Sequence, residues 1–213
     1  DGSSDGSSAP FVYATDAFSQ KFNPFIYSTV YDGEVANVCV ETVSSYTRSG
    51  SVIMEGLGDG TTEEYNGTEY NYQGLSNITV DQAEDSTTYT VELRQGVLFA
   101  DGEEMNADDL IFSIYVLLDP SYTGSQTLTS NNIIGYDDYV AGTAPSVEGV
   151  KKIDDYTVSI TTEGYSVTTI YDIIAIPLAP MHYYGDESLY DYDNNQFGFT
   201  FGDLSSVQDN LEP

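Results

Sequence analysis

The sequence predicts a mixed α/β fold in which short antiparallel strands and helices share a core. Three observations carry this prediction. Residues 88–94 alternate apolar and polar side chains at the two-residue period of a strand, residues 106–119 have the pattern of a capped apolar helix, and residues 150–160 have that of a hairpin. A chain of 213 residues that is 40% apolar can bury such a core in one or two domains.

The first fifty residues predict a linker, a strand, a turn and a helix. Residues 1–10 contain the run DGSSDGSS and are expected to be flexible, and a short apolar strand is expected at 11–13. Pro24 fixes its own backbone and disfavours helix at Asn23, which predicts a turn. A helix is predicted over 35–43. Its expected cap and apolar face are Asp32, Val35, Val38, Cys39 and Thr42.

The next segment is predicted to be rich in strands. Glycines interrupt residues 50–73, which predicts strand fragments that form a hairpin with an enlarged loop. Residues 77–80 and 89–94 predict two strands, paired antiparallel across the polar tract 81–86. In the second strand, one buried face is expected from Tyr89, Val91 and Leu93.

The helix predicted after Asn106 has clear start and stop signals. Asn106 can cap its first turn, and Asp108 and Asp109 lie near the positive end of its dipole. Pro120 stops it just after Asp119. Its apolar surface, expected to pack against the preceding strands, consists of Leu110, Ile111, Ile114, Tyr115, Leu117 and Leu118.

The last third predicts a hairpin and a further apolar element. Residues 150–153 and 156–160 flank Asp154-Asp155, a spacing typical of a tight turn. Residues 170–176 predict an apolar helix or a turn into a strand, ended by Pro177. From residue 183 onward the chain has little periodicity.

An ordered set of motifs spans residues 93–113: Leu-Arg-x-Gly, an aromatic residue, Asp-Gly, Ala-x-Asp and an aromatic-Ser pair. The residues are Leu93, Arg94, Gly96, Phe99, Asp101, Gly102, Ala107, Asp109, Phe112 and Ser113. This set resembles the signature of the bacterial extracellular solute-binding proteins of family 5, which deliver oligopeptides, dipeptides or nickel to ABC importers. The turn at 22–24 and segments 136–142, 150–161 and 176–180 are similar to the family as well, so the resemblance covers roughly residues 11–187. It departs from the family at 56–73 and past 191.

The resemblance implies a fold like that of type II periplasmic binding proteins. Because family members run to several hundred residues, the chain is expected to be an N-terminal portion: a partial first lobe with an inserted β-rich subdomain, the second lobe being absent. The implied divisions are a linker over 1–10, the first part of lobe I over 11–50, the inserted α+β subdomain over 51–163, and a truncated return into lobe I over 164–213.

The resemblance also implies where ligand would bind. The segment after the Asn23-Pro24 turn and the loop after the signature helix, around 125–129, would face a groove between the two lobes. The implied ligand-binding residues are Ser28, Thr29, Val30, Tyr31, Ser125, Gln126 and Thr127. Such segments would offer backbone hydrogen bonds to an extended peptide.

The charge of the chain excludes several classes of partner. With 35 acidic and 5 basic residues, its formal net charge of −30 disfavours nucleic acid and anionic lipid, because few cations are available to neutralise phosphates. The strongly hydrated surface favours solubility, and we expect a monomer. Such acidity is compatible with a salt-adapted source or with capture of cationic solutes.

Several residues are of types found in catalytic or metal-binding sites, but the sequence favours neither function for any of them. His182 is the only histidine and has no accompanying nucleophile motif, and Cys39 is the only cysteine, expected to be a small buried residue. The adjacent pairs Asp108-Asp109 and Asp137-Asp138 cannot flank one bond, because neighbouring helical residues point about 100° apart. The run at 191–195 matches only the first ligand positions of a calcium loop, Asp191, Asp193 and Asn195. We therefore expect no catalytic residue, no metal and no cofactor.

Arg94 and the aromatic residues are the remaining candidates for ligand contact. Arg94 is expected to be structural, pinning the acidic turn at Asp101 and Glu103, with ligand contact as the alternative. The 19 tyrosines and 9 phenylalanines are better suited in kind to contact peptide, although most should be core.

The leading hypothesis is a non-enzymatic peptide receptor of an ABC importer, working by closure of two lobes and docking on a membrane permease. It would be exported and lipid-anchored on the outer face of the cell membrane, or periplasmic in a two-membrane cell. The alternatives are a cell-surface adhesion module that uses tyrosine-rich loops at 65–72 and 183–192, and a carboxylate-based glycoside hydrolase, which no spacing supports.

Overall fold

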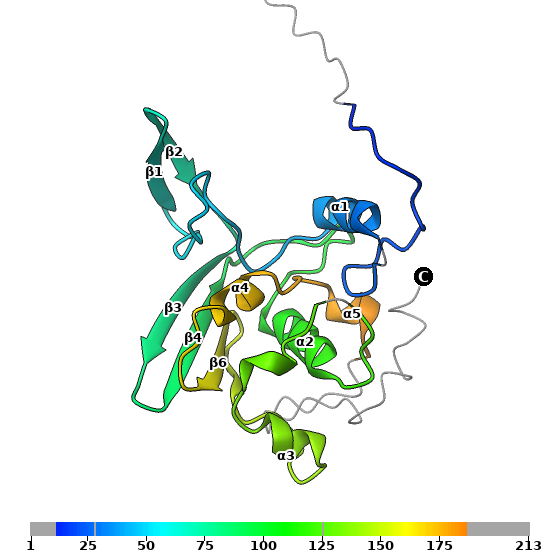
Figure 1. Ribbon diagram of the computed structural model, residues 1–213, viewed down its shortest axis with the longest axis vertical. Helices are drawn as coiled ribbons and strands as arrows, with labels where there is room; N and C mark the ends of the chain where they lie inside the picture. Colours follow the sequence, from blue (N-terminus) through cyan, green and yellow to red (C-terminus); the bar gives the residue numbers. More distant parts are fainter. Residues whose placement is uncertain (1–11, 28, 125, 187–213) are drawn as a thin grey trace, which may run out of the picture.

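A buried helix lies at the centre of the molecule, with an antiparallel sheet on one side. The computed structural model describes residues 12–27, 29–124 and 126–186 (Figure 1). The sheet has four strands in the order β3-β4-β6-β5, all antiparallel. They are β3 (Ser76–Gln82), β4 (Ser86–Leu93), β6 (Thr157–Glu163) and β5 (Val150–Asp154).

The central strand β4 has the predicted alternation. Tyr89, Val91 and Leu93 are buried and Glu92 is exposed, so one face of the strand enters the core. The predicted antiparallel pairing with β3 is confirmed, with Ile78 opposite Val91. Each of these apolar side chains contributes about 1.5–3 kcal/mol by burial. Local periodicity was therefore sufficient to place this strand.

The predicted hairpin at 150–160 is also confirmed, but its turn lies one residue later. Asp154 pairs with Thr157, so Asp155 and Tyr156 form the turn. The Asp154 carboxylate accepts a hydrogen bond from Tyr156 N at 2.9 Å, which stabilises that turn. A register shift between Lys152 and Asp154 produces the offset.

Helix α2 (Ala107–Leu118) begins and ends where predicted. Asn106 caps it and Asp109 completes a capping box, with Asn106 N donating to Asp109 Oδ2 at 2.9 Å. The helix is buried almost all round rather than on one face, because α5 and the segment around Phe25 cover the side that faces away from the sheet. The helix packs on the predicted sheet: it lies closest to β5 and β6 and shares one core with Ile78, Tyr89, Val91 and Leu93 of the strands predicted at 77–80 and 89–94.

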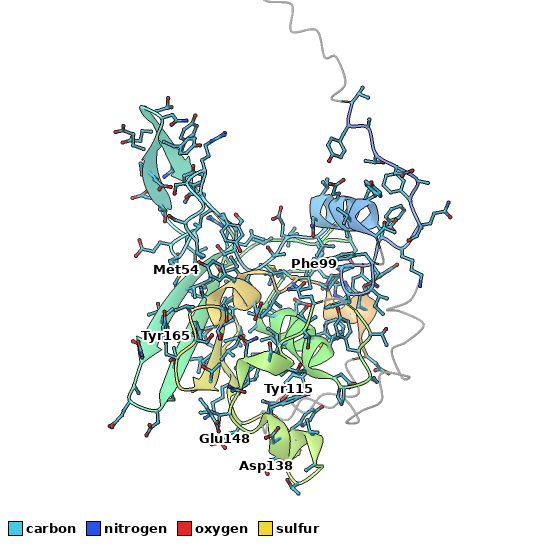
Figure 2. All side chains as sticks on the ribbon, viewed as in Figure 1. Met54, Phe99, Tyr115, Asp138, Glu148 and Tyr165 are labelled. Carbon is cyan, nitrogen blue, oxygen red and sulfur yellow. The ribbon has the colours of Figure 1, made fainter. Side chains whose placement is uncertain are left out.

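Tyr115 is labelled in Figure 2 and extends from α2 toward α3 (Tyr136–Val140). Its ring meets Tyr139 edge-to-face with 5.5 Å between centroids. Its hydroxyl accepts a hydrogen bond from Val147 N at 2.9 Å. Burial raises the pKa of Tyr115 to about 12, so this buried phenol stays neutral. The short helix α3 lies within the segment 136–142 that resembles the family.

Strands β1 (Thr61–Tyr65) and β2 (Thr68–Tyr72) form a separate two-stranded hairpin that projects from the body (Figure 1). The predicted enlarged loop is wrong. Asn66 (φ 52°) and Gly67 (φ 76°) form a two-residue turn, because both residue types tolerate the left-handed conformation that such a turn requires.

Arg94 holds the base of that hairpin. Its Nε donates to Gly74 O and its Nη2 to Gly56 O, each at 3.0 Å. The prediction that Arg94 pins Asp101 and Glu103 is therefore wrong. The end of β4 lies beside two backbone carbonyls, and these satisfy the guanidinium fork.

The N-terminal predictions need the largest corrections. Residues 12 and 13 form no strand and are exposed. Helix α1 spans Val30–Cys39 with Thr29 as its cap, instead of 35–43 capped by Asp32. Its buried residues are Asp32, Gly33 and Ala36, so the expected apolar face at Val35, Val38, Cys39 and Thr42 is not the buried one. Cys39, predicted to be buried, is exposed.

The remaining helices are short. They are the 3-10 turn η1 (Thr129–Asn131), α4 (Thr169–Ile174) and α5 (Met181–Tyr184). The helical alternative for 170–176 is confirmed by α4, which ends before Pro177. Between residues 12 and 186, none of the helices combines the length and apolar character that a bilayer span needs.

Candidate ligand-binding groove

The Asn23-Pro24 turn directs the chain toward α1. Asn23 is buried, and its side-chain oxygen accepts hydrogen bonds from Phe25 N at 2.8 Å and Ile26 N at 3.3 Å. An asparagine that bonds the backbone two and three residues later closes a local turn by itself. The turn predicted from Pro24 therefore has its own internal support.

The loop after α2 folds back onto this turn. The Tyr122 hydroxyl donates to Phe25 O at 2.5 Å, across 97 residues of sequence. Burial raises the pKa of Tyr122, which keeps it protonated as a donor. A Cβ on Gly124 would lie 2.3 Å from Phe25 O, so only glycine allows this close approach. The two segments that the family resemblance assigned to ligand therefore start from one shared contact.

Two further segments pair with each other, and the loop after α2 is bonded to one of them. Residues 41–44 run antiparallel to 174–178, with Val43 N to Ile176 O at 3.0 Å and Leu178 N to Glu41 O at 2.8 Å. The Gln126 side chain donates to Ala175 O at 2.7 Å. The loop after α2 is thereby fastened to the end of α4.

These segments enclose a groove of about 370 Å³. Tyr27 lines it from the segment after the Asn-Pro turn and Gln126 lines it from the loop after α2. Asn37 and Ser45 add further polar side chains. The groove therefore combines amide, hydroxyl and aromatic groups from four parts of the sequence, a composition that suits a polar chain-like ligand.

The predicted ligand residues are divided by the structure. Gln126 lines the groove, and the Thr127 hydroxyl is engaged with Leu117 O at 3.2 Å. Thr29 caps α1. Val30 is 73% exposed, and Tyr31 lines a different cavity together with Tyr13 and Phe18. Ser28 and Ser125 lie outside the described residues.

Several lining residues were not predicted from the sequence. Ser44, Ser45 and Tyr46 line the groove because residues 41–44 pair with the return segment near Pro177. That pairing joins positions about 130 residues apart. Only the resemblance at 176–180 pointed to the return segment at all.

Asp32 anchors the start of α1, the helix that carries Asn37. It is buried and accepts four hydrogen bonds, from Ser19 N and Oγ, Gln20 N and Thr29 Oγ1. Desolvation of the carboxylate raises its pKa, but these bonds outweigh that effect and the pKa of Asp32 lies below its usual value. A polar network, which helical periodicity does not reveal, thus fixes the buried face of α1.

The signature residues hold the fold together rather than line the groove. Gly96 and Gly102 adopt positive φ angles of 74° and 96°, and Gly96 N donates to Glu104 Oε1 at 2.7 Å. Asp109 is buried and accepts from Met181 N at 2.8 Å, which ties α2 to α5. Burial raises the pKa of Asp109.

His182 pairs with Asp101, Nε2 to Oδ2 at 2.6 Å. The hydrogen bond from His182 lowers the pKa of Asp101, and the same bond raises the pKa of His182. The imidazole is therefore part of a link between the Asp-Gly turn and α5.

The paired acids have structural partners. Lys152 Nζ lies 2.9 Å from Asp108 Oδ1, and Asp138 accepts from the Thr143 hydroxyl at 3.2 Å. Within the described ranges, no group of three or more His, Cys, Asp and Glu side chains is placed to hold a metal ion. The calcium-loop pattern at Asp191, Asp193 and Asn195 lies outside them.

Comparison with known sequences identifies related proteins. Residues 69–201 match the model of the bacterial extracellular solute-binding proteins, family 5 (middle region). The oligopeptide-binding protein OppA of Lactococcus lactis subsp. lactis is 34% identical over 104 residues, covering 47% of this chain and 17% of that protein. The oligopeptide-binding protein AmiA of Streptococcus pneumoniae is 28% identical over 158 residues, covering 70% and 22%.

Solved structures share the fold. The Haemophilus influenzae OppA complex with RPPGFSPFR superposes with a TM-score of 0.56 at 20% identity, over 80% of this chain and 31% of that one. AppA from Bacillus subtilis, in complex with a nonapeptide, gives 0.54 at 18% identity, over 79% and 27%. This chain therefore has the α/β fold of one part of these binding proteins, and it spans about a fifth of the length of the curated relatives it matches.

Proposed function

This chain belongs to the bacterial extracellular solute-binding proteins of family 5, and we propose that it forms one wall of a groove in which a receptor captures oligopeptides for an ABC importer. The observation that carries the proposal is the groove itself. The segment after the Asn-Pro turn and the loop after α2, joined by the Tyr122–Phe25 hydrogen bond, both reach it.

The groove is chemically suited to a peptide. The side chains of Asn37, Ser45 and Gln126 offer amide and hydroxyl groups, and Tyr27 and Tyr46 offer flat amphipathic surfaces. Such groups bind a peptide backbone while tolerating many side chains. The OppA and AmiA relatives are described as oligopeptide-binding proteins, and the Haemophilus structure contains a peptide, which supports the same ligand class here.

The proposed mechanism is closure of two lobes around the peptide. This chain supplies one wall, a second lobe supplies the other, and the closed form docks on the permease. The role is non-catalytic, consistent with a family of binding proteins. A single wall supplies only part of the contacts to the peptide. This chain by itself should therefore bind peptide with a Kd of about 1 mM or weaker.

The division into regions and the location belong to the same proposal. Residues 51–163 would be the inserted subdomain, with 11–50 and 164–213 contributing to lobe I, and residues 1–10 would tether an exported, lipid-anchored protein. Each part can be tested separately, the subdomain by expressing residues 51–163 alone and the anchor by labelling cells with a lipid precursor.

Calorimetry and mass spectrometry of retained ligand test the proposal on the complete reading frame that contains this chain and on the chain itself. We expect the complete protein to retain peptides and the chain to retain few or none. Ser45→Trp, which places a bulky side chain at an exposed groove position, should weaken binding at least tenfold, whereas Ser166→Trp, also exposed, should not. Absence of peptide from the complete protein would overturn the proposal.

A second candidate function is adhesion, favoured by the projecting β1–β2 hairpin (Figure 1). Arg48 lies over the Tyr70 ring at 4.5 Å and Tyr65 is 38% exposed, so the hairpin presents an ordered aromatic surface. The rest of the proposed adhesive loop at 183–192 lies largely outside the described residues. Replacing residues 59–73 by a short glycine linker should abolish cell attachment if adhesion is the function, and should leave peptide binding intact if it is not.

A further inference from the structure

Two tyrosines that are distant in sequence stack at the rim of the groove. Tyr46 and Tyr171 lie with ring centroids 6.2 Å apart and planes 26° from parallel. Their exposed fractions are 50% and 47%. About half of each residue therefore remains in contact with solvent and accessible to a ligand.

The backbone holds this pair in place. Tyr46 follows the segment whose Ser44 N donates to Ile174 O at 3.1 Å, and Tyr171 lies on α4 one turn before Ile174. Tyr46 also forms a bridge with Val52, which fixes the other side of the segment. The ring stack therefore joins two anchored elements, as a preorganised binding surface requires.

Among the described residues that line the groove, the one charged residue is acidic, Glu41. Asp172 follows Tyr171 on α4, but its carboxylate accepts a hydrogen bond from Asn131 Nδ2 at 3.0 Å and so is engaged away from the ring pair. No arginine or lysine is among the residues that line the groove within the described part of the chain. Arg48, two residues from Tyr46, is engaged over Tyr70 instead.

We infer that the Tyr46–Tyr171 pair is a subsite for a basic side chain of the bound peptide. A lysine ammonium or arginine guanidinium over these rings would gain cation–π attraction, and the acidic character of the groove and of the chain would favour a cation over an anion. A glutamate at the same place would be repelled. The inference rests on the proposed function and adds to it a preference among peptides.

The test uses the complete reading frame and alanine-based pentapeptides with one variable residue scanned through every position. Lysine, arginine, norleucine, phenylalanine and glutamate are compared at 20 mM and 500 mM NaCl. At its best position lysine or arginine should bind roughly fivefold tighter than norleucine at low salt, and high salt should reduce the difference.

Substitutions test whether the preference for lysine over norleucine depends on the Tyr46–Tyr171 pair. Tyr171→Leu should remove most of the difference between lysine and norleucine while retaining norleucine binding, and Tyr46→Leu should remove the same difference. Tyr171→Phe keeps the ring and should retain the preference. Tyr65→Leu, in β1, is the control and should change neither value, and thermal melts confirm that each variant is folded.

The possible results distinguish the proposed subsite from the proposed peptide-binding function. Equal binding of lysine and norleucine, tighter binding of phenylalanine than of lysine, or a preference unchanged in both leucine variants overturns the subsite while the peptide-binding function stands. Failure of every peptide to bind overturns the function, and the subsite with it.

Discussion

Asp109 connects three parts of the chain through one carboxylate. One oxygen accepts from Asn106 N at 2.9 Å in the capping box of α2, and the other accepts from Met181 N at 2.8 Å at the start of α5. Only the first contact follows from the sequence, because capping is local. The second depends on a fold that returns a residue 72 positions away.

Asp109→Ala should destabilise the chain by about 2 kcal/mol or more, because it removes a cap contact and leaves buried N–H groups without acceptors. Urea denaturation measures the change. Asp108→Ala is the matched control, since it removes the half-buried contact with Lys152 and should cost about 1 kcal/mol or less. An Asp109 variant as stable as the Asp108 variant would contradict this role.

His182 should make stability depend on pH in one direction. Its hydrogen bond to Asp101 raises its folded pKa. The stabilisation is therefore complete below the unfolded pKa of about 6.5 and is lost as the pH rises through the folded value. Because both side chains are partly exposed, solvent screens the pair and its contribution to stability should be small.

An NMR titration of this single histidine should give a pKa above 6.5, and His182→Gln should remove the corresponding step from the pH profile of unfolding. A titration midpoint at or below 6.5 would show that the pair with Asp101 does not form in solution.

At the scale of elements, the helices and strands that depend on local sequence patterns were predicted correctly, and those that depend on contacts between distant residues were not. The alternation in β4 and the cap of α2 were predictable because each lies within a dozen residues. Helix α1 was misplaced because its buried face is Asp32, Gly33 and Ala36. That face is set by bonds from Ser19 and Gln20 and by the Tyr27 ring packed on Gly33, none of which produces an apolar period.

The β1–β2 hairpin depends on its two-residue turn. Gly67→Ala places a Cβ at φ 76° and should weaken the hairpin by about 1 kcal/mol, because left-handed backbone is unfavourable for alanine. Hydrogen exchange should accelerate within 61–72 and remain unchanged in β4. Gly74→Ala is the control, since its φ is not positive and its Cβ would make only an ordinary contact of 3.8 Å. Equal effects of the two substitutions would contradict the assigned turn.

At the scale of the whole molecule, the net charge of −30 favours solubility but destabilises the folded state through repulsion between carboxylates. Salt screens repulsion between carboxylates that have few cationic partners, so the thermal midpoint should rise between 20 mM and 500 mM NaCl. A melting series at fixed pH measures this. A midpoint that falls with salt would show that the few ion pairs, such as Lys152 with Asp108, outweigh the repulsion.

The groove itself was only partly predictable. Resemblance to the family indicated the loop that contains Gln126 and the segment that follows Tyr27. Ser45 and Tyr46 were not predicted, because they reach the groove only through pairing between residues 41–44 and 174–178. The site is therefore a property of the assembled chain, in contrast to the signature turn and helix.

The most direct test of a peptide groove is an amide NMR titration of the complete protein with a library of mixed peptides. The largest shifts are expected on Tyr27, residues 44–46 and Gln126. Shifts confined to the β1–β2 hairpin, or no shifts at saturating peptide, would contradict it.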